Sequence, residues 1–329
     1  MNKTFFLILM TLSLLHFLIG CNSKSMSEDK LNHSRMQCNL SNPNVGTTKT
    51  FTLCKKLAEK GNADAQYSLG GMYEFGEGVE KDLTQAFQWY QKAADQGDDF
   101  GQFNLGRMYE FGKGVEKDLT QAFQWYQNAA VQGNDGGQVA LGSMYQVGEG
   151  VEQDLTQAFH WYQKAAEQGN FSAQGLLGYM YRFGAGVEKD SIQAFQRYQK
   201  AAEQGSAYGQ FELGQMYGLG EGVEKDLLQA FQWNEKAAEQ GSVRGQLNLG
   251  RMYEFGEGVE KDLTQAFHWY QKAAVQGDVN AQSYLSNLYF IGIGTKKVAE
   301  KSTYWLQKSN GGGLRKISLI QIEQSFDRE

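Results

Sequence analysis

A 36-residue period runs through most of this chain and constrains its fold more than any other feature. Every spacing between neighbouring tryptophans is 36 or 72 residues, and they stand at Trp89, Trp125, Trp161, Trp233, Trp269 and Trp305. Tyr73 recurs at the same step as far as Tyr289, and no insertion breaks the register across seven copies. A strict period in this range is typical of a solenoid built from one repeated supersecondary unit.

One unit of the period predicts two helices. Ala65, Leu69 and Met72 lie at helical spacing, and Gly76 is placed to end that helix because glycine tolerates the left-handed conformation. The second helix of the unit carries a broad apolar face over residues 86–94. Because one helix pair cannot bury its apolar face alone, stacked neighbours are needed to complete the core.

Capping residues mark the start of both helices. Asp82 and Gln85 have the form of a capping box, in which Asp82 accepts from helical amides and Gln85 reaches back to the cap. The first helices of the units are predicted to begin after an equivalent set of caps, namely Asn62, Asp98, Asn134, Asn170, Ser206, Ser242 and Asp278. Local capping therefore agrees with the helix-pair interpretation in each repeat.

The repeated pattern of Leu69-Gly70, Met72-Tyr73, Gly76-Glu77-Gly78-Val79, Asp82 and Trp89-Tyr90 resembles the Sel1-like repeat, a relative of the tetratricopeptide repeat. The resemblance covers residues 62–309. It implies an all-α fold, a right-handed α-solenoid of helix-turn-helix repeats, and binding of a protein or peptide on the concave face. Some cysteine-rich members are described as penicillin-binding, but they carry a cysteine pair in each repeat, which this chain lacks.

The ends of the repeat array depart from the pattern. Residues 49–61 align with a second helix and predict an N-terminal capping helix, whereas residues 310–329 predict a C-terminal tail or closing helix. Within the array, Arg197 replaces the repeated tryptophan and Asn234 replaces the repeated tyrosine. Each of these two replacements either loosens the local packing or marks a bend.

The first twenty residues form an apolar run of signal-peptide length. The run ends Leu18-Ile19-Gly20-Cys21, which resembles the lipobox of bacterial lipoproteins, and this resemblance implies cleavage before Cys21 and lipidation of its thiol. The alternative is an ordinary secretory signal with a chance cysteine. Asn22 in place of the aspartate of an inner-membrane signal favours the outer membrane, facing the periplasm, and residues 21–48 are a polar tether.

Cys38 and Cys54 are the remaining cysteines. In an exported, oxidising compartment we predict that they form a disulfide that holds the tether to the capping helix. The alternative is that Cys54, at a core position, is only a small buried apolar residue.

The sequence contains few residues in arrangements typical of catalytic or cofactor-binding sites. The Gly76-Glu77-Gly78 turn follows a helix and recurs in every unit, so we do not interpret it as a nucleotide-binding loop. His160 and His268 occupy one repeated second-helix position without neighbours at metal spacing, and a net charge of −6 argues against nucleic acid. We therefore predict no enzyme activity, no metal and no cofactor.

Positions that vary between otherwise near-identical first helices are the candidates for partner selectivity. They lie at the equivalents of residues 67, 71, 74 and 75, and the protein-binding candidates among them are Phe103, Arg107, Tyr179, Arg182, Phe211, Gln215, Arg251 and Glu254. A mixture of aromatic residues and arginine suits a protein interface. At the Phe75 position the alternative is that these side chains fill the core between repeats.

Three functions are consistent with these features. The first is a non-enzymatic, monomeric interaction scaffold held by lipid in the periplasm. The second is an immunity protein that neutralises a secreted antibacterial lipase effector, a function found among exported proteins with similar repeats. The third is a β-lactamase-like hydrolase; Ser27-Glu28-Asp29-Lys30 has the Ser-x-x-Lys spacing but lies in the tether without partner motifs.

Overall fold

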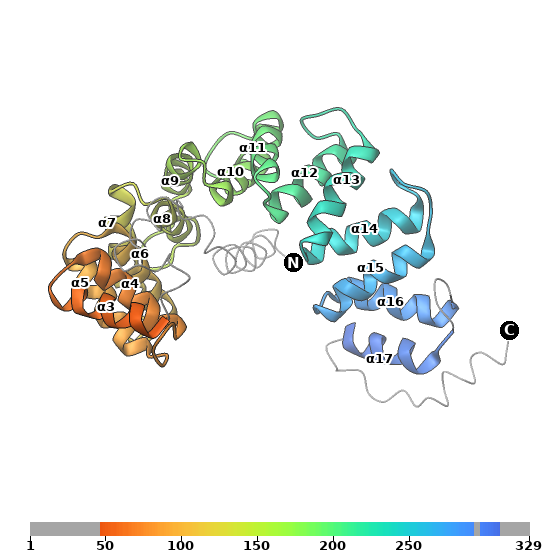
Figure 1. Ribbon diagram of the computed structural model, residues 1–329. Helices are drawn as coiled ribbons and strands as arrows, with labels where there is room; N and C mark the ends of the chain where they lie inside the picture. The colour runs from red at the N-terminus through yellow and green to blue at the C-terminus, as the bar shows by residue number, and fades with distance from the viewer. Residues whose placement is uncertain (1–46, 293–296, 310–329) are drawn as a thin grey trace. The chain divides into compact units, whose positions relative to one another are not determined.

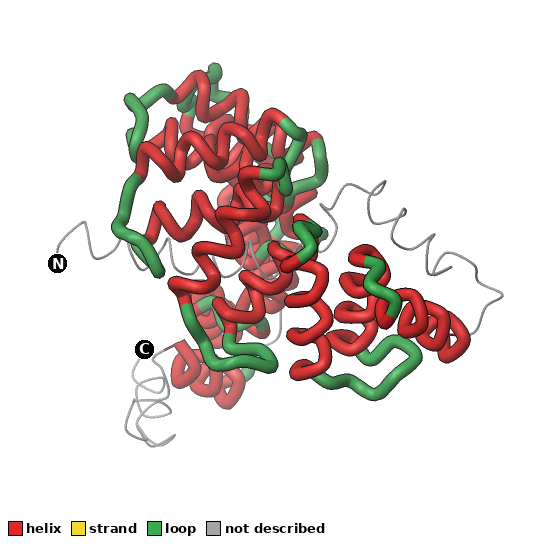
Figure 2. The backbone as a smooth tube through the Cα atoms, turned by 90° about the vertical axis from the view of Figure 1, so that its left-hand side faces the viewer, coloured by secondary structure: helices red, strands yellow, loops and turns green. Residues whose placement is uncertain are grey.

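The computed structural model describes residues 47–292 and 297–309, and within them every regular element is an α-helix (Figures 1 and 2). The first helices of the successive pairs are α4 (Ala63–Phe75), α6 (Asp99–Phe111), α8 (Asp135–Val147), α10 (Phe171–Phe183), α12 (Ala207–Leu219), α14 (Val243–Phe255) and α16 (Val279–Ile291). The second helices are α5 (Leu83–Asp95), α7 (Leu119–Val131), α9 (Leu155–Glu167), α11 (Ser191–Glu203), α13 (Leu227–Glu239), α15 (Leu263–Val275) and α17 (Ala299–Ser309). The predicted all-α solenoid is confirmed, and within the described residues a single helix, α3 (Thr47–Glu59), precedes the pairs.

The chain divides into two compact units at Asp190 and Ser191. The N-terminal unit contains α3 to α10, and the C-terminal unit contains α11 to α17. In each unit, consecutive helices pack against one another in chain order, as Figure 1 shows for each stack of helices. This nearest-neighbour packing is the arrangement expected of a repeat protein.

The helix boundaries follow from caps at both ends. The side chain of Asn62 accepts a hydrogen bond of 2.7 Å from the backbone N–H of Ala65, which begins α4. Gly76 adopts φ 77°, in the left-handed region, and its N–H donates to the Met72 carbonyl oxygen. The predicted N-cap and glycine stop of the first helix are therefore both present.

The second helix begins with only half of the predicted capping box. Asp82 accepts from the N–H groups of Thr84 and Gln85, but its own N–H donates to the Tyr73 carbonyl oxygen at 3.0 Å. The donor that Gln85 was expected to satisfy is thus already bonded to the preceding helix. The Gln85 side chain instead lies 3.4 Å from that of Gln88 on the exposed surface.

Neighbouring repeats are joined by apolar contacts and by glutamine side chains. Phe87 of α5 meets Tyr109 of α6 edge to face, with ring centroids 5.4 Å apart. The buried Gln102 side chain donates to the Ala94 carbonyl oxygen and accepts from the side chain of Gln132, 30 residues further on. The bond to Ala94 joins α6 to the preceding pair and so fixes one repeat against the next, whereas the bond from Gln132 joins α6 to the end of α7 within one pair.

The N-terminal helix packs against the first helix of the first pair. α3 begins at Thr47, two residues before the predicted boundary, and its Phe51 ring lies edge to face with that of Tyr73. Cys54 is fully buried in the same cluster as Leu69 and Met72. The predicted signal peptide, the predicted tether up to residue 46 and the segment 310–329 lie outside the described residues. Within the described part of the chain, none of the helices has both the length and the apolar character to cross a bilayer.

Candidate binding surface

The variable positions of the first helices form four columns that repeat every 36 residues. We name them by their members in α4, as the 67, 71, 74 and 75 columns. Residues four and seven or eight apart share one side of a helix, so the four columns lie along one side of each first helix. We call this side the first-helix face.

The 67 column is part of the packing between helices. Phe103 is half-buried, with its ring centroid 5.8 Å from that of Tyr126 on α7. Tyr67 lies between Tyr90 of its own pair and Phe100 of α6, with ring centroids 5.9 and 5.7 Å away. Phe211, the candidate in this column of the C-terminal unit, is also half-buried. The candidates Phe103 and Phe211 are thus only partly accessible to a partner.

The members of the 71 column are half-buried or exposed, with the exception of the buried Ser143. The Arg107 side chain donates to the Asn104 side chain at 3.1 Å, and its guanidinium lies 5.9 Å from the Phe103 ring centroid. In the C-terminal unit, Gln215 is half-buried and Arg251 is exposed. Side chains of this kind, which carry a polar group on an apolar stem and remain at least partly accessible, are suited to recognition of a protein surface.

Tyr179 of the 71 column joins two neighbours at the end of α10. Its ring centroid lies 4.8 Å from that of Phe183, and the Arg182 guanidinium lies 5.5 Å from the same Phe183 ring. Phe183 is 55 % exposed. Two rings and a cation therefore form a small accessible cluster on the first-helix face of the N-terminal unit.

The 74 column is mainly structural. Its acidic and amide side chains accept a hydrogen bond from a tyrosine hydroxyl 16 residues later, in the pairs Tyr90–Glu74, Tyr126–Glu110, Tyr162–Gln146 and Tyr270–Glu254. Burial and the neighbouring Glu74 carboxylate raise the pKa of Tyr90 well above its usual value, so this hydroxyl stays a donor. Glu254, predicted as a partner contact, accepts a hydrogen bond from the Tyr270 hydroxyl and so has a structural role.

The 75 column is exposed, which answers the question left open by the sequence. Phe75, Phe183 and Phe255 are 65 %, 55 % and 61 % exposed, so they do not fill a core between repeats. The valine that follows six of the seven Gly-x-Gly segments takes that role instead, as Val79 and Val115 do in their apolar clusters.

The turn itself reaches the preceding repeat. Gly114 approaches the Leu83 carbonyl group so closely that any side chain there would collide with it. This contact brings Val115 into the core beside Ala86 and Leu105. The sequence signal for it was the valine that follows six of the seven Gly-x-Gly segments, which had been interpreted only as turns.

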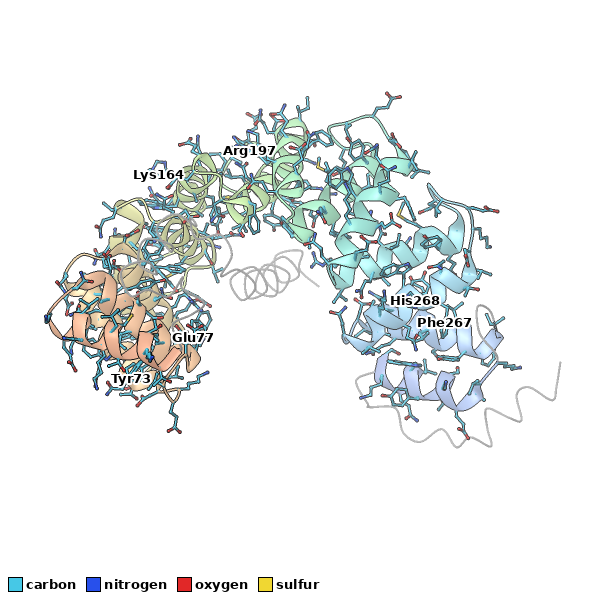
Figure 3. All side chains as sticks on the ribbon, in the orientation of Figure 1. Tyr73, Glu77, Lys164, Arg197, Phe267 and His268 are labelled. Carbon is cyan, nitrogen blue, oxygen red and sulfur yellow. The ribbon has the colours of Figure 1, made fainter. Side chains whose placement is uncertain are left out.

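The second helices carry a different surface. Lys92 and Lys164 lie over the rings of Trp89 and Trp161, with each ammonium nitrogen 3.8 and 4.3 Å from the ring centroid. Figure 3 shows His268 next to Phe267 on α15, and both His268 and His160 are exposed. Within residues 47–292 and 297–309, no cluster of three or more potential ligands is placed to hold a metal ion.

The predicted modification sites fall mainly beyond the described residues. Cys21 and Cys38 both lie there, so lipidation and the Cys38–Cys54 pairing stay predictions. Cys54 itself is fully buried and takes part in a disulfide.

Comparisons with known proteins agree with the repeat architecture. The Sel1 repeat model matches seven consecutive segments, at residues 63–98, 100–134, 136–170, 172–206, 207–242, 243–278 and 279–311. No curated protein matches the chain.

Two solved structures are similar over nearly the whole chain. One is c5321, a protective antigen present in uropathogenic Escherichia coli strains, with 38 % identity and a TM-score of 0.71; the match covers 91 % of this chain and 64 % of that one. The other is a Sel1 repeat protein from Oxalobacter formigenes, with 31 % identity and a TM-score of 0.67, covering 97 % and 93 %. This chain thus spans slightly less than two thirds of the length of c5321.

A more distant similarity is to the immunity protein Pa5087 from Pseudomonas aeruginosa. That match has 24 % identity and a TM-score of 0.45, and it covers 65 % of this chain and 81 % of that one. It is too distant to bear on function.

Proposed function

Because this chain belongs to the Sel1 repeat family, we propose that it is a non-enzymatic scaffold that binds a protein or peptide partner through the first-helix face. Sel1 repeat proteins bind protein partners and are generally non-catalytic. The single observation that carries the assignment to this face is the 71 column, where Arg107, Tyr179, Gln215 and Arg251 vary on an otherwise repeated frame and remain accessible.

In this column, the residues that hold the helices together are different from the residues that are accessible to a partner. The neighbouring core positions, such as Leu105 and Met108, are buried and repeat closely, so they hold the helices. A substitution at Arg251, which is exposed, leaves these core contacts in place. Selectivity for a partner can therefore change without disturbing the stack.

The scaffold is further proposed to be a monomer anchored by lipid at Cys21 in the outer membrane, facing the periplasm. The support is the Leu18-Ile19-Gly20-Cys21 ending of an apolar run. A Cys21→Ser substitution should abolish membrane association, and intact-mass analysis of the wild type should give a cleaved, acylated Cys21. An unmodified wild-type chain in the soluble fraction would contradict the anchor.

The proposed partner is a protein whose capture depends on the 71 column and on Arg182. Arg107→Ala, Tyr179→Ala, Arg182→Ala and Arg251→Ala should each weaken partner capture from crosslinked cell envelopes, by roughly thirtyfold in affinity where the residue is a hot spot. The melting temperature should barely change. His160→Ala and His268→Ala, on the exposed surface of second helices, are the matched controls and should bind like the wild type.

The same experiment separates the alternative functions. Capture of a secreted lipase, with protection of cells that express the chain, would make the scaffold an immunity protein. Turnover of a β-lactam by the purified protein would instead support the hydrolase hypothesis. Loss of binding in the histidine variants, with no loss in the four first-helix variants, would move the binding site to the second helices and contradict the proposal.

A further inference from the structure

The 75 column forms an exposed apolar ridge at the C-terminal ends of the first helices. In the N-terminal unit the ridge consists of Phe75, Phe111, Val147 and Phe183, and in the C-terminal unit it consists of Leu219, Phe255 and Ile291. Except for the half-buried Val147, all of these side chains are exposed. Apolar side chains repeated at one exposed position are unusual on a soluble surface and indicate an interaction site.

The loops beside this ridge are rich in glutamate. In the loop after α4, Glu77 and Glu80 are exposed, and the same loop contains one lysine, Lys81. Figure 3 shows Glu77 in this loop. The loop 148–154 has Glu149 and Glu152 and no lysine. The loops 220–226 and 256–262 repeat the sequence of the first, so four of the six complete loops carry more glutamate than lysine.

The C-terminal ends of the first helices add to this negative field, whereas the charge of the N-cap aspartates is offset. Asp82 and its equivalents are already bonded to backbone N–H groups of the second helices, whose N-terminal dipoles offset their charge. The C-terminal ends of the first helices, directly before the loops, contribute partial negative charge. The glutamates are therefore not neutralised by the helices between which they lie.

Two rings of the ridge already bind a cation of the chain itself. Lys113 Nζ lies 5.7 Å from the Phe111 ring centroid, and the Arg182 guanidinium lies 5.5 Å from that of Phe183. The residue equivalent to Lys113 in the loops after α4 and α14 is Glu77 and Glu257. At these two loops the ring remains, but the local cation is replaced by an anion.

We propose that the partner docks on the ridge through a basic amphipathic polypeptide segment, with its apolar side chains against the 75 column and its lysine or arginine side chains against the glutamates and ring faces. This inference rests on the proposed function, because the ridge borders the 71 column on the first-helix face. It names the chemistry of the partner, which the proposed function leaves open. Apolar contact supplies affinity, and the acidic loops select the sign of the partner's charge.

Synthetic peptides of defined charge test this inference on the purified protein. The basic probe is a fluorescently labelled amphipathic helix of leucine and lysine, and its matched control has glutamate at every lysine position. Fluorescence anisotropy should give binding of the basic probe at least tenfold tighter than that of the acidic probe. The preference should decrease as salt concentration rises, because exposed charges are screened.

Substitutions in the protein locate the probe. Phe183→Ser and Phe255→Ser, one in each unit, should each weaken binding of the basic probe at least fivefold. Val131→Ser and Val275→Ser, at equally accessible residues near the ends of second helices, are the controls and should change it less than twofold. Glu149→Gln with Glu152→Gln should weaken the basic probe and reduce the salt dependence.

Several outcomes would overturn the inference. It is wrong if the basic probe does not bind, if the acidic probe binds as tightly, or if the valine controls lose as much binding as the phenylalanine variants. It is also wrong if phosphatidylglycerol vesicles bind and depend on the same phenylalanines, since the ridge would then meet lipid. If an acidic or neutral probe binds and Arg251→Ala weakens it, the inference fails while the proposed function stands.

Discussion

The helix pairs α6–α7 and α12–α13 fill the same position between their two helices with different side chains. In α6–α7 the Tyr126 ring lies against Gly106, and its hydroxyl donates to Glu110. In α12–α13 the equivalent of the tyrosine is Asn234, which is fully buried, and the equivalent of the glutamate is Gly218.

Asn234 satisfies its polar atoms within the local backbone and the next repeat. Its Nδ2 donates to the Ala230 carbonyl oxygen at 2.7 Å, and its Oδ1 accepts from Asn248 Nδ2 at 3.0 Å. The hydroxyl and its acceptor have thus been replaced together. Since a buried polar atom without a partner is costly, replacing one of the two alone would be unfavourable.

The difference shows that variation between repeats has two physical origins. At the 74 column of α12–α13 the residue changes together with the residue 16 positions later, so this variation belongs to packing; in α10–α11, by contrast, Arg182 replaces the acid while Tyr198 is retained. At the 71 column, residues such as Gln215 and Arg251 change while the core positions beside them stay the same. Variation that leaves the core positions in place, as at the 71 column and at Arg182, is available for recognition of a partner.

The largest expected effect is at the glycine beneath the tyrosine. A Cβ atom at residue 106 would lie 2.7 Å from Tyr126 Cδ1, so Gly106→Ala should lower the free energy of unfolding by about 3 kcal/mol through overpacking. Gly218→Ala is the control, because its Cβ would meet only Ala230 Cβ at an ordinary 3.7 Å. Urea denaturation should show the control unchanged or stabilised by up to about 1 kcal/mol. Equal destabilisation of both variants would contradict the packing account.

Removing one hydroxyl tests the buried bridge directly. Tyr90→Phe leaves Glu74, which is 6 % exposed, without its donor at 2.9 Å. The free energy of unfolding should fall by about 2 kcal/mol. Tyr304→Phe, at a ring that is 51 % exposed, should change it by less than about 0.5 kcal/mol. If the two substitutions cost the same, the 74 column is not structural.

A double-mutant cycle tests whether the pair Asn234 and Gly218 can be converted to the tyrosine–glutamate pair of other repeats. Asn234→Tyr alone introduces a hydroxyl with no acceptor at Gly218, and Gly218→Glu alone introduces a carboxylate with no donor. The two changes together should be more favourable than the sum of the single changes by about 1 kcal/mol, measured as the coupling free energy of unfolding. A coupling of zero would indicate that the two positions vary independently.

The smallest effect concerns alkaline pH. Burial raises the pKa of Tyr162, so the folded state keeps this proton where an unfolded tyrosine, with a pKa of about 10, loses it. The stabilisation is complete below about pH 10 and is lost as pH rises above that value. Tyr162→Phe should make this decline shallower by up to about 1.4 kcal/mol per pH unit in urea denaturation. An unchanged slope would mean that Tyr162 ionises equally in both states.

The sequence predicted the features that depend on local chemistry. The 36-residue period, the caps such as Asn62 and the glycine stops such as Gly76 each act within a few residues, and all are present. The roles of Val115 and Glu254 were not predicted, because they depend on contacts between residues distant in sequence. For Glu254 a signal was available in the sequence: in four repeats, an acid or amide at the 74 column occurs together with a tyrosine 16 residues later.

The most direct test of the proposed binding surface is site-specific photocrosslinking in intact cells. A photoreactive amino acid is placed at Gln215 or Arg251 on first helices and, as controls, at His160 or His268 on second helices. We expect a covalent adduct with a protein partner from positions 215 and 251, and none from 160 or 268. Adducts from the histidine positions, with none from the first helices, would contradict the assignment of binding to the first-helix face.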